Sequence, residues 1–174
     1  MVWFENTNTY NLLNNTSYTG ILCLNIGDYF WGNKDTLITT ILGSCVSVCI
    51  WHPEKKIGGM CHFKLPESRL EKTRKPLKYD GNFGKEAIEY LSQKISSTGI
   101  PKEEFKISIF GGSSIIQSLS DNMKFDVGNR NIECAEKELN KRGFKIHKKD
   151  VGGITSRKLY VDLETGVVAV KHNK

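Results

Sequence analysis

Two neighbouring runs of strand-forming residues constrain the fold of this chain most. Residues 36–51 are rich in β-branched side chains and are interrupted at Gly43, and residues 56–65 follow after a turn that contains Pro53. From Cys45 to Ile50 the side chains alternate with the period of two that is typical of a β-strand. A short turn between two such runs favours a hairpin. We therefore expect a strand, a tight turn at Gly43, and then a β-hairpin.

The remaining elements predict a mixed α and β fold. An alternating run from Ile21 to Phe30 predicts one earlier strand, and apolar stripes at helical spacing predict helices over 84–97 and 129–142. Further strands are predicted later in the chain, at 106–110, 144–151 and, as a hairpin, 157–172. Strands outnumber helices, so the pattern favours a single α+β domain.

Length and composition agree with one globular domain. The chain has 174 residues, of which 39% are hydrophobic and 25% charged. No stretch approaches the ~20 consecutive apolar residues that span a bilayer, and residues 1–20 lack the basic and apolar regions of a secretory signal. We expect a cytoplasmic protein without membrane insertion, with a flexible N-terminal extension over 1–20 and a catalytic domain over 21–174.

Charge and cysteine content exclude several classes of protein. The net charge is +6, but the basic residues are spread along the chain and form no basic run interleaved with aromatic residues. Nucleic acid is therefore not an expected partner. Five cysteines, an odd number, argue against a framework of disulfides.

The segment Leu42-Gly43-Ser44-Cys45-Val46 is the strongest candidate for chemistry. A cysteine directly after a Gly-Ser turn lies at the edge of a strand, and glycine permits the backbone conformation that such a turn needs. The amides of Gly43, Ser44 and Cys45 could then converge as an oxyanion hole. The alternative is a buried core cysteine beside a turn.

His62, in the second run, is the candidate base for Cys45. Pairing of the hairpin would bring its imidazole near Cys45, where it would lower the thiol pKa from ~8.5 and favour the thiolate. A third group usually orients such an imidazole. Asp35 is the only nearby acidic candidate for this group. Thr39 and Thr40 are also candidates, and strand alternation puts only one of them on the active face. The alternative is a histidine satisfied within the core.

Two other uses of the cysteines are less well supported. A zinc site would combine Cys45, Cys49, Cys61 and His62, but their spacing does not match zinc motifs, and adjacent strand residues point to opposite faces. No metal is therefore expected. A thiol-redox role for Cys45 would need a resolving cysteine, and Cys49 lies four residues away without a C-x-x-C motif.

The order of these and later motifs resembles the CheD family, the chemoreceptor glutamine deamidases. The resemblance begins with Leu-Gly-Ser-Cys-Val and Gly-Gly-Met-Cys-His-Phe-Lys-Leu-Pro and extends over about Ile21 to His172. The later motifs that carry it are Lys78-Tyr79-Asp80, Phe110-Gly111-Gly112, Val127-Gly128-Asn129-Arg130-Asn131, Asp150-Val151-Gly152-Gly153, Arg157 and Thr165-Gly166.

The resemblance implies a triad of Thr39, Cys45 and His62 and a cofactor-free hydrolase. Such an enzyme converts specific glutamines of chemoreceptor cytoplasmic domains to glutamate through a thioester, in chemotaxis adaptation, and methyl-ester hydrolysis is also attributed to it. The implied fold is an α/β sandwich of mixed sheets with two or three helices, similar to toxin-type cysteine deamidases. A CheC-type phosphatase is an implied partner in some members. The rival interpretation is a non-catalytic adaptor that docks such a phosphatase or a receptor.

Overall fold

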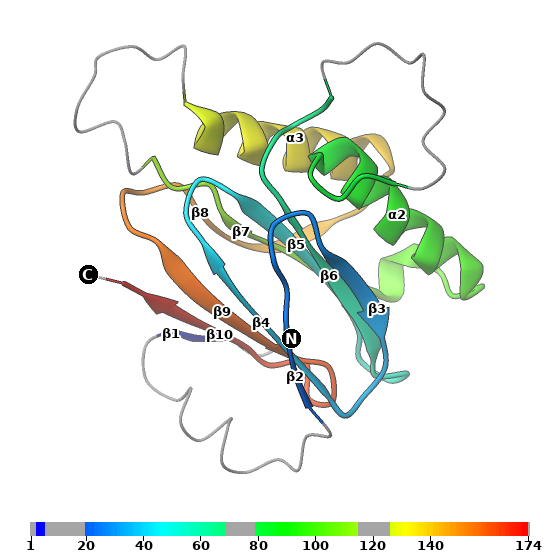
Figure 1. The fold of residues 1–174 in the computed structure, drawn as a ribbon. Helices are drawn as coiled ribbons and strands as arrows, with labels where there is room; N and C mark the ends of the chain where they lie inside the picture. Colours follow the sequence, from blue (N-terminus) through cyan, green and yellow to red (C-terminus); the bar gives the residue numbers. More distant parts are fainter. Residues whose placement is uncertain (1–2, 6–19, 69–78, 115–125, 174) are drawn as a thin grey trace.

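The computed structural model describes residues 3–5, 20–68, 79–114 and 126–173, which form two five-stranded sheets and two α-helices (Figure 1). One sheet has the order β1 (Trp3–Glu5), β10 (Val168–His172), β9 (Arg157–Asp162), β4 (Thr36–Leu42) and β2 (Gly20–Cys23). The other has the order β3 (Tyr29–Gly32), β6 (Ile57–Phe63), β5 (Val46–His52), β7 (Lys106–Gly111) and β8 (Ile146–Val151). Both sheets contain parallel and antiparallel pairs.

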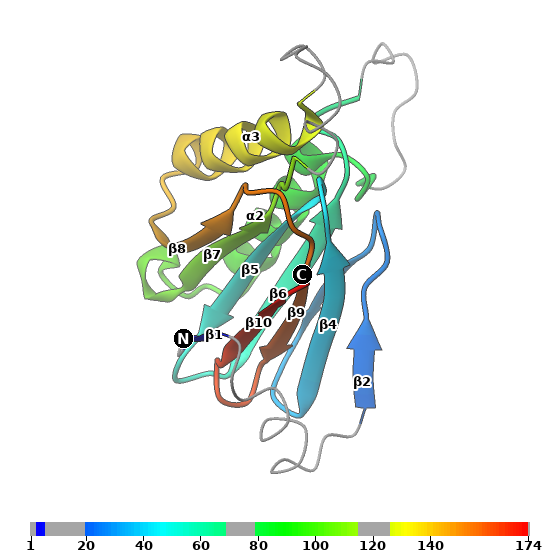
Figure 2. The same cartoon turned by 90° about the vertical axis from the view of Figure 1, so that its left-hand side faces the viewer.

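Three layers enclose two hydrophobic cores. The sheets pack face to face through a core that includes Leu42, Met60 and Val161. On its other face, the β5-containing sheet packs against α2 (Gly84–Ser97) and α3 (Val127–Lys141) through a second core (Figures 1 and 2). The predicted α+β class is confirmed, as is the sandwich of mixed sheets with helices.

Strand β5 lies at the centre of this arrangement. All seven of its residues are buried, because sheet partners lie on both edges, the other sheet on one face and the helices on the other. This explains why Val46–His52 reads as a nearly continuous apolar run with small polar residues between the large ones.

The predicted hairpin and both helices are confirmed. Strands β5 and β6 pair antiparallel, with Ser47 opposite His62. The single strand predicted over 21–30 is wrong, because the run is divided between β2 and β3 in different sheets. The turn between them is stabilised by the Asp28 carboxylate, which accepts the backbone N–H of Asn25 at 2.8 Å.

Strands β4 and β5 also belong to different sheets, so the chain crosses from one to the other at residues 43–45. Part of the predicted N-terminal extension, Trp3–Glu5, pairs with β10. Residues 6–19 lie outside the described residues, as does most of the charged loop after His62, 69–78. The division at residue 20 stays a prediction. Neither described helix is long and apolar enough to cross a membrane.

Candidate active site

Cys45 is half-buried at the crossing between the sheets, and the carbonyls of residues 43–45 each accept a hydrogen bond. The Gly43 carbonyl accepts from the Ser113 backbone N–H at 2.8 Å. The Ser44 carbonyl accepts from the Asn131 side chain at 3.0 Å. The Cys45 carbonyl accepts from the Gly112 N–H at 2.8 Å. The turn that presents the thiol is therefore held by three hydrogen bonds.

These bonds determine where the amides of the turn point. In a trans peptide the carbonyl and the following N–H point in opposite directions. Because the Ser44 carbonyl faces Asn131, the Cys45 N–H points away from Asn131. The same N–H acts to lower the pKa of the Cys45 thiol, so it favours negative charge at the sulfur. The Ser44–Cys45 peptide therefore presents one backbone donor on the side of the thiol, and support from Gly43 stays a prediction.

Gly111 allows β7 to approach this turn closely. Its φ is +104°, a backbone conformation that favours glycine. A Cβ at this position would lie 2.2 Å from the Cys45 carbonyl oxygen. The Phe-Gly-Gly motif at 110–112 therefore belongs to the architecture of the cysteine turn.

Ser113, which bonds to this turn, also joins a partly buried charged network that the sequence analysis did not assign to the site. The Ser113 hydroxyl accepts from the Arg157 guanidinium at 3.0 Å, and Arg157 also pairs with Asp150. Asp150 in turn contacts His172 at 3.0 Å. Arg157 is buried, and its two terminal nitrogens are paired, whereas its Nε has no hydrogen-bond partner among the described residues. The Asp-Val-Gly-Gly and Arg motifs of the resemblance thus contribute to holding the loop whose Ser113 N–H fixes Gly43.

His62 lies in β6, with its ring directed between the sheets rather than toward the helices. It is 3% exposed. Its Nδ1 lies 2.9 Å from the Thr40 hydroxyl oxygen, and that hydroxyl lies 2.7 Å from the Leu24 carbonyl. The hydroxyl has one proton, and in its bond with the Leu24 carbonyl it is the donor, because a carbonyl oxygen can only accept. The hydroxyl therefore accepts from the ring, so Nδ1 carries the proton and Nε2 holds a lone pair.

Burial lowers the pKa of His62, against the opposing effects of the Leu24 carbonyl and the Asp28 charge. Neutral imidazole is therefore the form favoured at this position. Nε2 is buried and has no hydrogen-bond partner among the described residues. A neutral ring with a bare, unengaged nitrogen has the properties of a general base.

Thr39 is expected from the family resemblance to orient the ring, but in this structure the hydroxyl bonded to Nδ1 is that of Thr40, and a role for Thr39 stays a prediction. The Thr39 hydroxyl is buried but forms no hydrogen bond with any described residue. Thr40 lies on the same face of β4 as Ile38 and Leu42, which pack between the sheets, whereas Thr39 is on the opposite face with the exposed Ile41. Because His62 also faces the space between the sheets, it meets Thr40.

Cys45 and His62 are brought to the same end of the sandwich, but no hydrogen bond joins them in the described structure, since Nε2 is unpartnered. Burial raises the pKa of the Cys45 thiol, while the charge of Lys64 acts to lower it. The resting pair is thus a neutral thiol and a neutral imidazole. Catalytic hydrogen bonds often tighten only when substrate binds.

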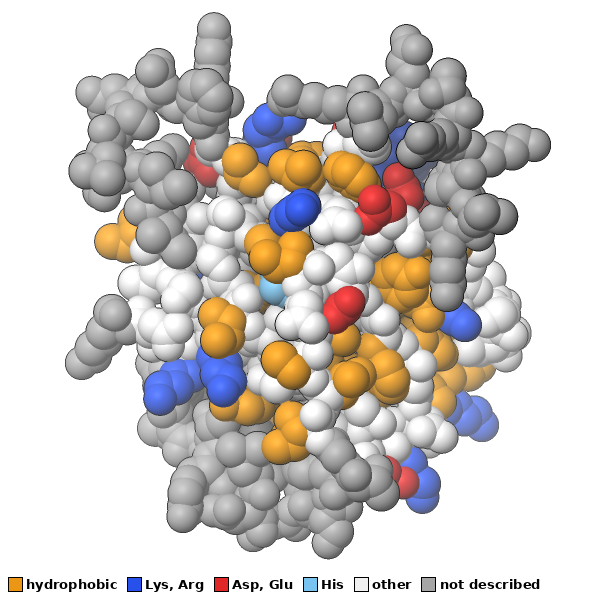
Figure 3. Space-filling model, viewed as in Figure 1, with side chains coloured by type: hydrophobic (Ala, Val, Ile, Leu, Met, Phe, Trp, Pro, Cys, Tyr) orange, Lys and Arg blue, Asp and Glu red, His pale blue; other side chains and the backbone are white. Residues whose placement is uncertain are grey.

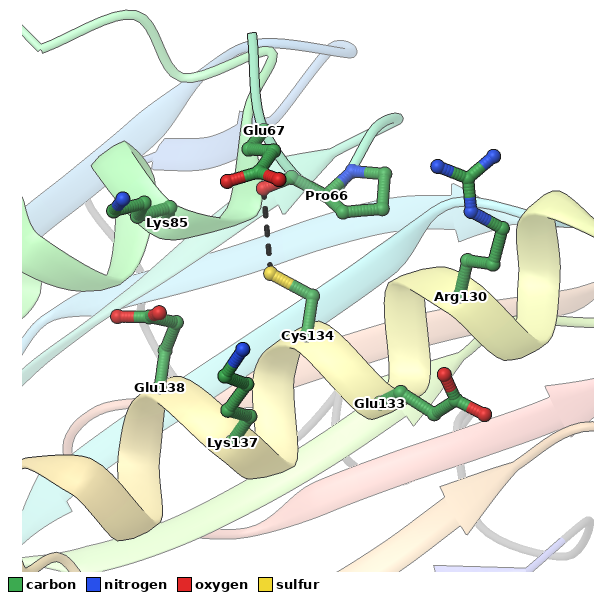
Figure 4. Close-up of a pocket in the computed structure, with 8 residues that line it drawn as sticks. All are labelled: Pro66, Glu67, Lys85, Arg130, Glu133, Cys134, Lys137 and Glu138. Carbon is green, nitrogen blue, oxygen red and sulfur yellow. Dashed lines mark hydrogen bonds between the residues drawn. The ribbon is translucent and has the colours of Figure 1, made fainter. Parts of the chain in front are cut away.

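Of the other cysteines, Cys49 and Cys61 are fully buried, whereas Cys45 is half-buried. Burial raises the pKa of Cys49 and raises that of Cys61 to about 12. Cys61 packs toward the helices, on the face opposite His62, so the two cannot share a metal ion. Cys134 lies in a shallow, charged pocket between α3 and the segment after β6, where its thiol contacts the Pro66 carbonyl at 3.3 Å (Figure 4). Burial and nearby Glu138 raise its pKa to about 11.

Comparison with known proteins agrees with this architecture. The model of the family described as CheD chemotactic sensory transduction matches residues 64–172. The chain belongs to the CheD family. The matched region contains Gly111, Ser113 and Asn131, all of which hold the cysteine turn, although the turn itself precedes it.

Curated relatives extend the CheD similarity over Cys45 and His62. A probable chemoreceptor glutamine deamidase CheD 1 of Chromobacterium violaceum is 36% identical over 151 residues, covering 87% of this chain and 77% of its own. A CheD 3 of Dechloromonas aromatica is 37% identical, covering 83% of each chain. A CheD of Methanococcus maripaludis is 36% identical, covering 87% and 94%. An alignment over 87% of this chain necessarily includes positions 45 and 62.

Proposed function

We propose that this chain is a protein-glutamine deamidase that acts on chemoreceptors, with Cys45 as nucleophile, His62 as general base and Thr40 as the residue that orients the ring. The curated relatives described above are named as probable chemoreceptor glutamine deamidases. The observation that carries the residue roles is the Leu24–Thr40–His62 chain of hydrogen bonds, which leaves Nε2 as an unpartnered base on β6, the strand paired with the one that follows Cys45.

Attack begins with transfer of the Cys45 proton to Nε2 of His62. The resulting thiolate adds to the carboxamide carbon of glutamine, and the carbonyl oxygen becomes an oxyanion. The Cys45 N–H, which points away from Asn131, is the backbone donor available on the thiol side of the turn. The Nδ1–H remains on the Thr40 hydroxyl, so the imidazolium formed in this step keeps its hydrogen bond.

Collapse of the oxyanion breaks the carbon–nitrogen bond. His62 returns its proton to the departing nitrogen, so ammonia leaves and a thioester to Cys45 remains. The same imidazole then removes a proton from water, which attacks the thioester and releases glutamate and the free thiol. No redox step occurs, and His62 mediates each proton transfer.

A protein substrate is consistent with the surface around the site. Two exposed hydrophobic side chains lie on segments that are hydrogen-bonded to the residues of the site. Ile26 precedes Gly27, whose N–H donates to the His62 carbonyl. Ile154 follows Gly153, whose carbonyl accepts from the Ser114 N–H. Ile41, 60% exposed, is the penultimate residue of β4, just before the cysteine turn. Figure 3 shows hydrophobic side chains spread over one face of the molecule among uncharged groups and a smaller number of Lys, Arg, Asp and Glu side chains. Apolar side chains with few charges are typical of the centres of protein interfaces.

Peptide mass analysis of a chemoreceptor cytoplasmic domain tests the proposal. The wild type should convert particular glutamines to glutamate, and Cys45→Ser should not. Cys23→Ser is the matched control, because Cys23 is an exposed cysteine of β2. Equal conversion by wild type and Cys45→Ser would remove Cys45 from the mechanism.

The same samples separate the two rival functions. A thiol-redox protein would accumulate sulfenic acid or a disulfide at Cys45 under mild peroxide and leave the glutamines intact. A docking adaptor would bind the receptor domain without changing the mass of either protein.

We also propose a cytoplasmic location and a CheC-type phosphatase as a second partner. The location follows from the substrate, because the glutamines implied by the family resemblance lie on receptor cytoplasmic domains. Co-elution of the purified chain with a CheC-type phosphatase in size-exclusion chromatography tests the partner, and separate elution at micromolar concentrations would contradict it.

A further inference from the structure

Asn131 connects the two segments that carry the proposed nucleophile and base. It lies near the start of α3, fully buried, and its side-chain nitrogen donates to the Ser44 carbonyl at 3.0 Å and the Lys64 carbonyl at 2.9 Å. Ser44 immediately precedes Cys45, and Lys64 is two residues after His62. Figure 2 shows the start of α3 beside the crossing from β4 to β5.

This side chain is not needed to begin the helix. The N-cap of α3 is Asp126, whose carboxylate accepts the backbone N–H of Asn129 at 3.0 Å. A gain in folding stability does not explain why an amide side chain is present at this position. Asn131 Oδ1 is buried and has no hydrogen-bond partner among the described residues. Such an unpaired oxygen is unfavourable. The contribution of Asn131 is therefore in the two carbonyls that it holds.

We propose that Asn131 is a positioning residue for catalysis: it orients the Cys45 peptide and sets the separation of the cysteine turn from the His62 strand. One amide proton of Asn131 bonds to the Ser44 carbonyl and the other to the Lys64 carbonyl, so one planar group fixes the position of the cysteine turn relative to the end of β6. Holding the Ser44 carbonyl directs the Cys45 N–H to the side of the thiol, where the oxyanion forms. This inference rests on the proposed deamidase function.

Asn131→Leu tests the role, because leucine has a similar size and no donor. Asn140→Leu is the matched control, since Asn140 is exposed on the same helix. We expect kcat for receptor deamidation to fall about 10²-fold, the effect of losing one oxyanion donor, with KM unchanged. A purely structural role would instead lower thermal stability and leave the kcat of the folded protein intact.

Alkylation of Cys45 by iodoacetamide as a function of pH gives a second readout that needs no receptor. In Asn131→Leu the Cys45 N–H no longer favours the thiolate, so the midpoint of the alkylation profile should move to higher pH. Cys23, exposed in β2, is the internal reference. Asn131→Ala, which also lacks donors and is smaller, replaces Asn131→Leu if circular dichroism shows that the leucine variant does not fold.

Three outcomes are distinguishable. A lower kcat with unchanged KM and a shifted alkylation profile supports the positioning role. An unchanged kcat and profile, or a rise in KM alone, overturns it. If the wild type fails to deamidate the receptor, the proposed function fails, and the alkylation profile alone then decides whether Asn131 positions Cys45.

Discussion

Replacing Thr40 by valine should impair catalysis, whereas the same replacement at Thr39 should not. Valine keeps the shape of threonine and removes only the hydroxyl. At Thr40 that hydroxyl lies 2.9 Å from Nδ1 of His62 and 2.7 Å from the Leu24 carbonyl. At Thr39 the hydroxyl is buried and makes no hydrogen bond with the described residues.

The expected size of the effect follows from the contacts that Thr40→Val leaves. Nδ1 of His62 would retain only the Leu24 carbonyl at 3.5 Å, a weak acceptor at that distance. Leaving a buried donor poorly paired costs about 1–3 kcal/mol, and each 1.36 kcal/mol changes a rate about tenfold. We expect kcat to fall by about ten- to a hundredfold, because the Nδ1–H tautomer is no longer favoured and the ring is free to turn.

Steady-state release of glutamate from a receptor cytoplasmic domain measures this effect. Thr40→Ser, which keeps the hydroxyl, should recover most of the activity, and Thr39→Val should stay within about twofold of the wild type, because it removes an unpaired buried hydroxyl. Loss of activity in Thr39→Val with normal activity in Thr40→Val would refute the orientation of β4 described above.

Three further predictions concern the turn, the surface and the base. Gly111→Ala should lower both the activity and the melting temperature. A φ of +104° costs alanine about 1–3 kcal/mol, and the added Cβ would lie 2.2 Å from the Cys45 carbonyl oxygen. Circular dichroism measures the loss of stability, and glutamate release measures the loss of activity. Ile154→Asp should raise KM several-fold without changing kcat, since Ile154 is 77% exposed; equal KM values would exclude it from substrate contact. Burial lowers the pKa of His62, so the unfolded state binds more protons. Acidification below about pH 6.5, the ordinary imidazole pKa, should therefore reduce the free energy of unfolding more in the wild type than in His62→Gln. Urea denaturation at several pH values measures this difference. Identical slopes of the free energy of unfolding against pH in the two proteins would contradict the burial of a neutral ring.

Much of the fold could be predicted because its signals are local. The turn after β5 and the apolar stripes of α2 and α3 depend on neighbouring residues, and each was found from the sequence. The division between β2 and β3 was missed because both halves alternate in the same way. Their separation depends on the turn at Asn25–Asp28 and on pairing with β4 and β6, which lie far along the chain.

Prediction of the site from the sequence is limited in the same way, by contacts between residues that are distant along the chain. Cys45 and His62 could be singled out from residue type and hairpin pairing, because β5 and β6 are neighbours in sequence and in the sheet. The choice between Thr39 and Thr40 could not be made by periodicity, because β4 lies in the other sheet and its phase depends on how the sheets pack. Asn131 was visible only as part of a motif, since its partners are 87 and 67 residues away.

Detection of the thioester tests the central claim most directly. The wild type is mixed with a receptor cytoplasmic domain, quenched in acid within the first turnover, digested and analysed by mass spectrometry. We predict a peptide containing Cys45 joined to a receptor peptide, with a mass equal to the sum of the two less one ammonia, and its loss after brief treatment with hydroxylamine. Conversion of glutamine to glutamate in the same sample, with Cys45 unmodified at every time point, would contradict covalent catalysis by this cysteine.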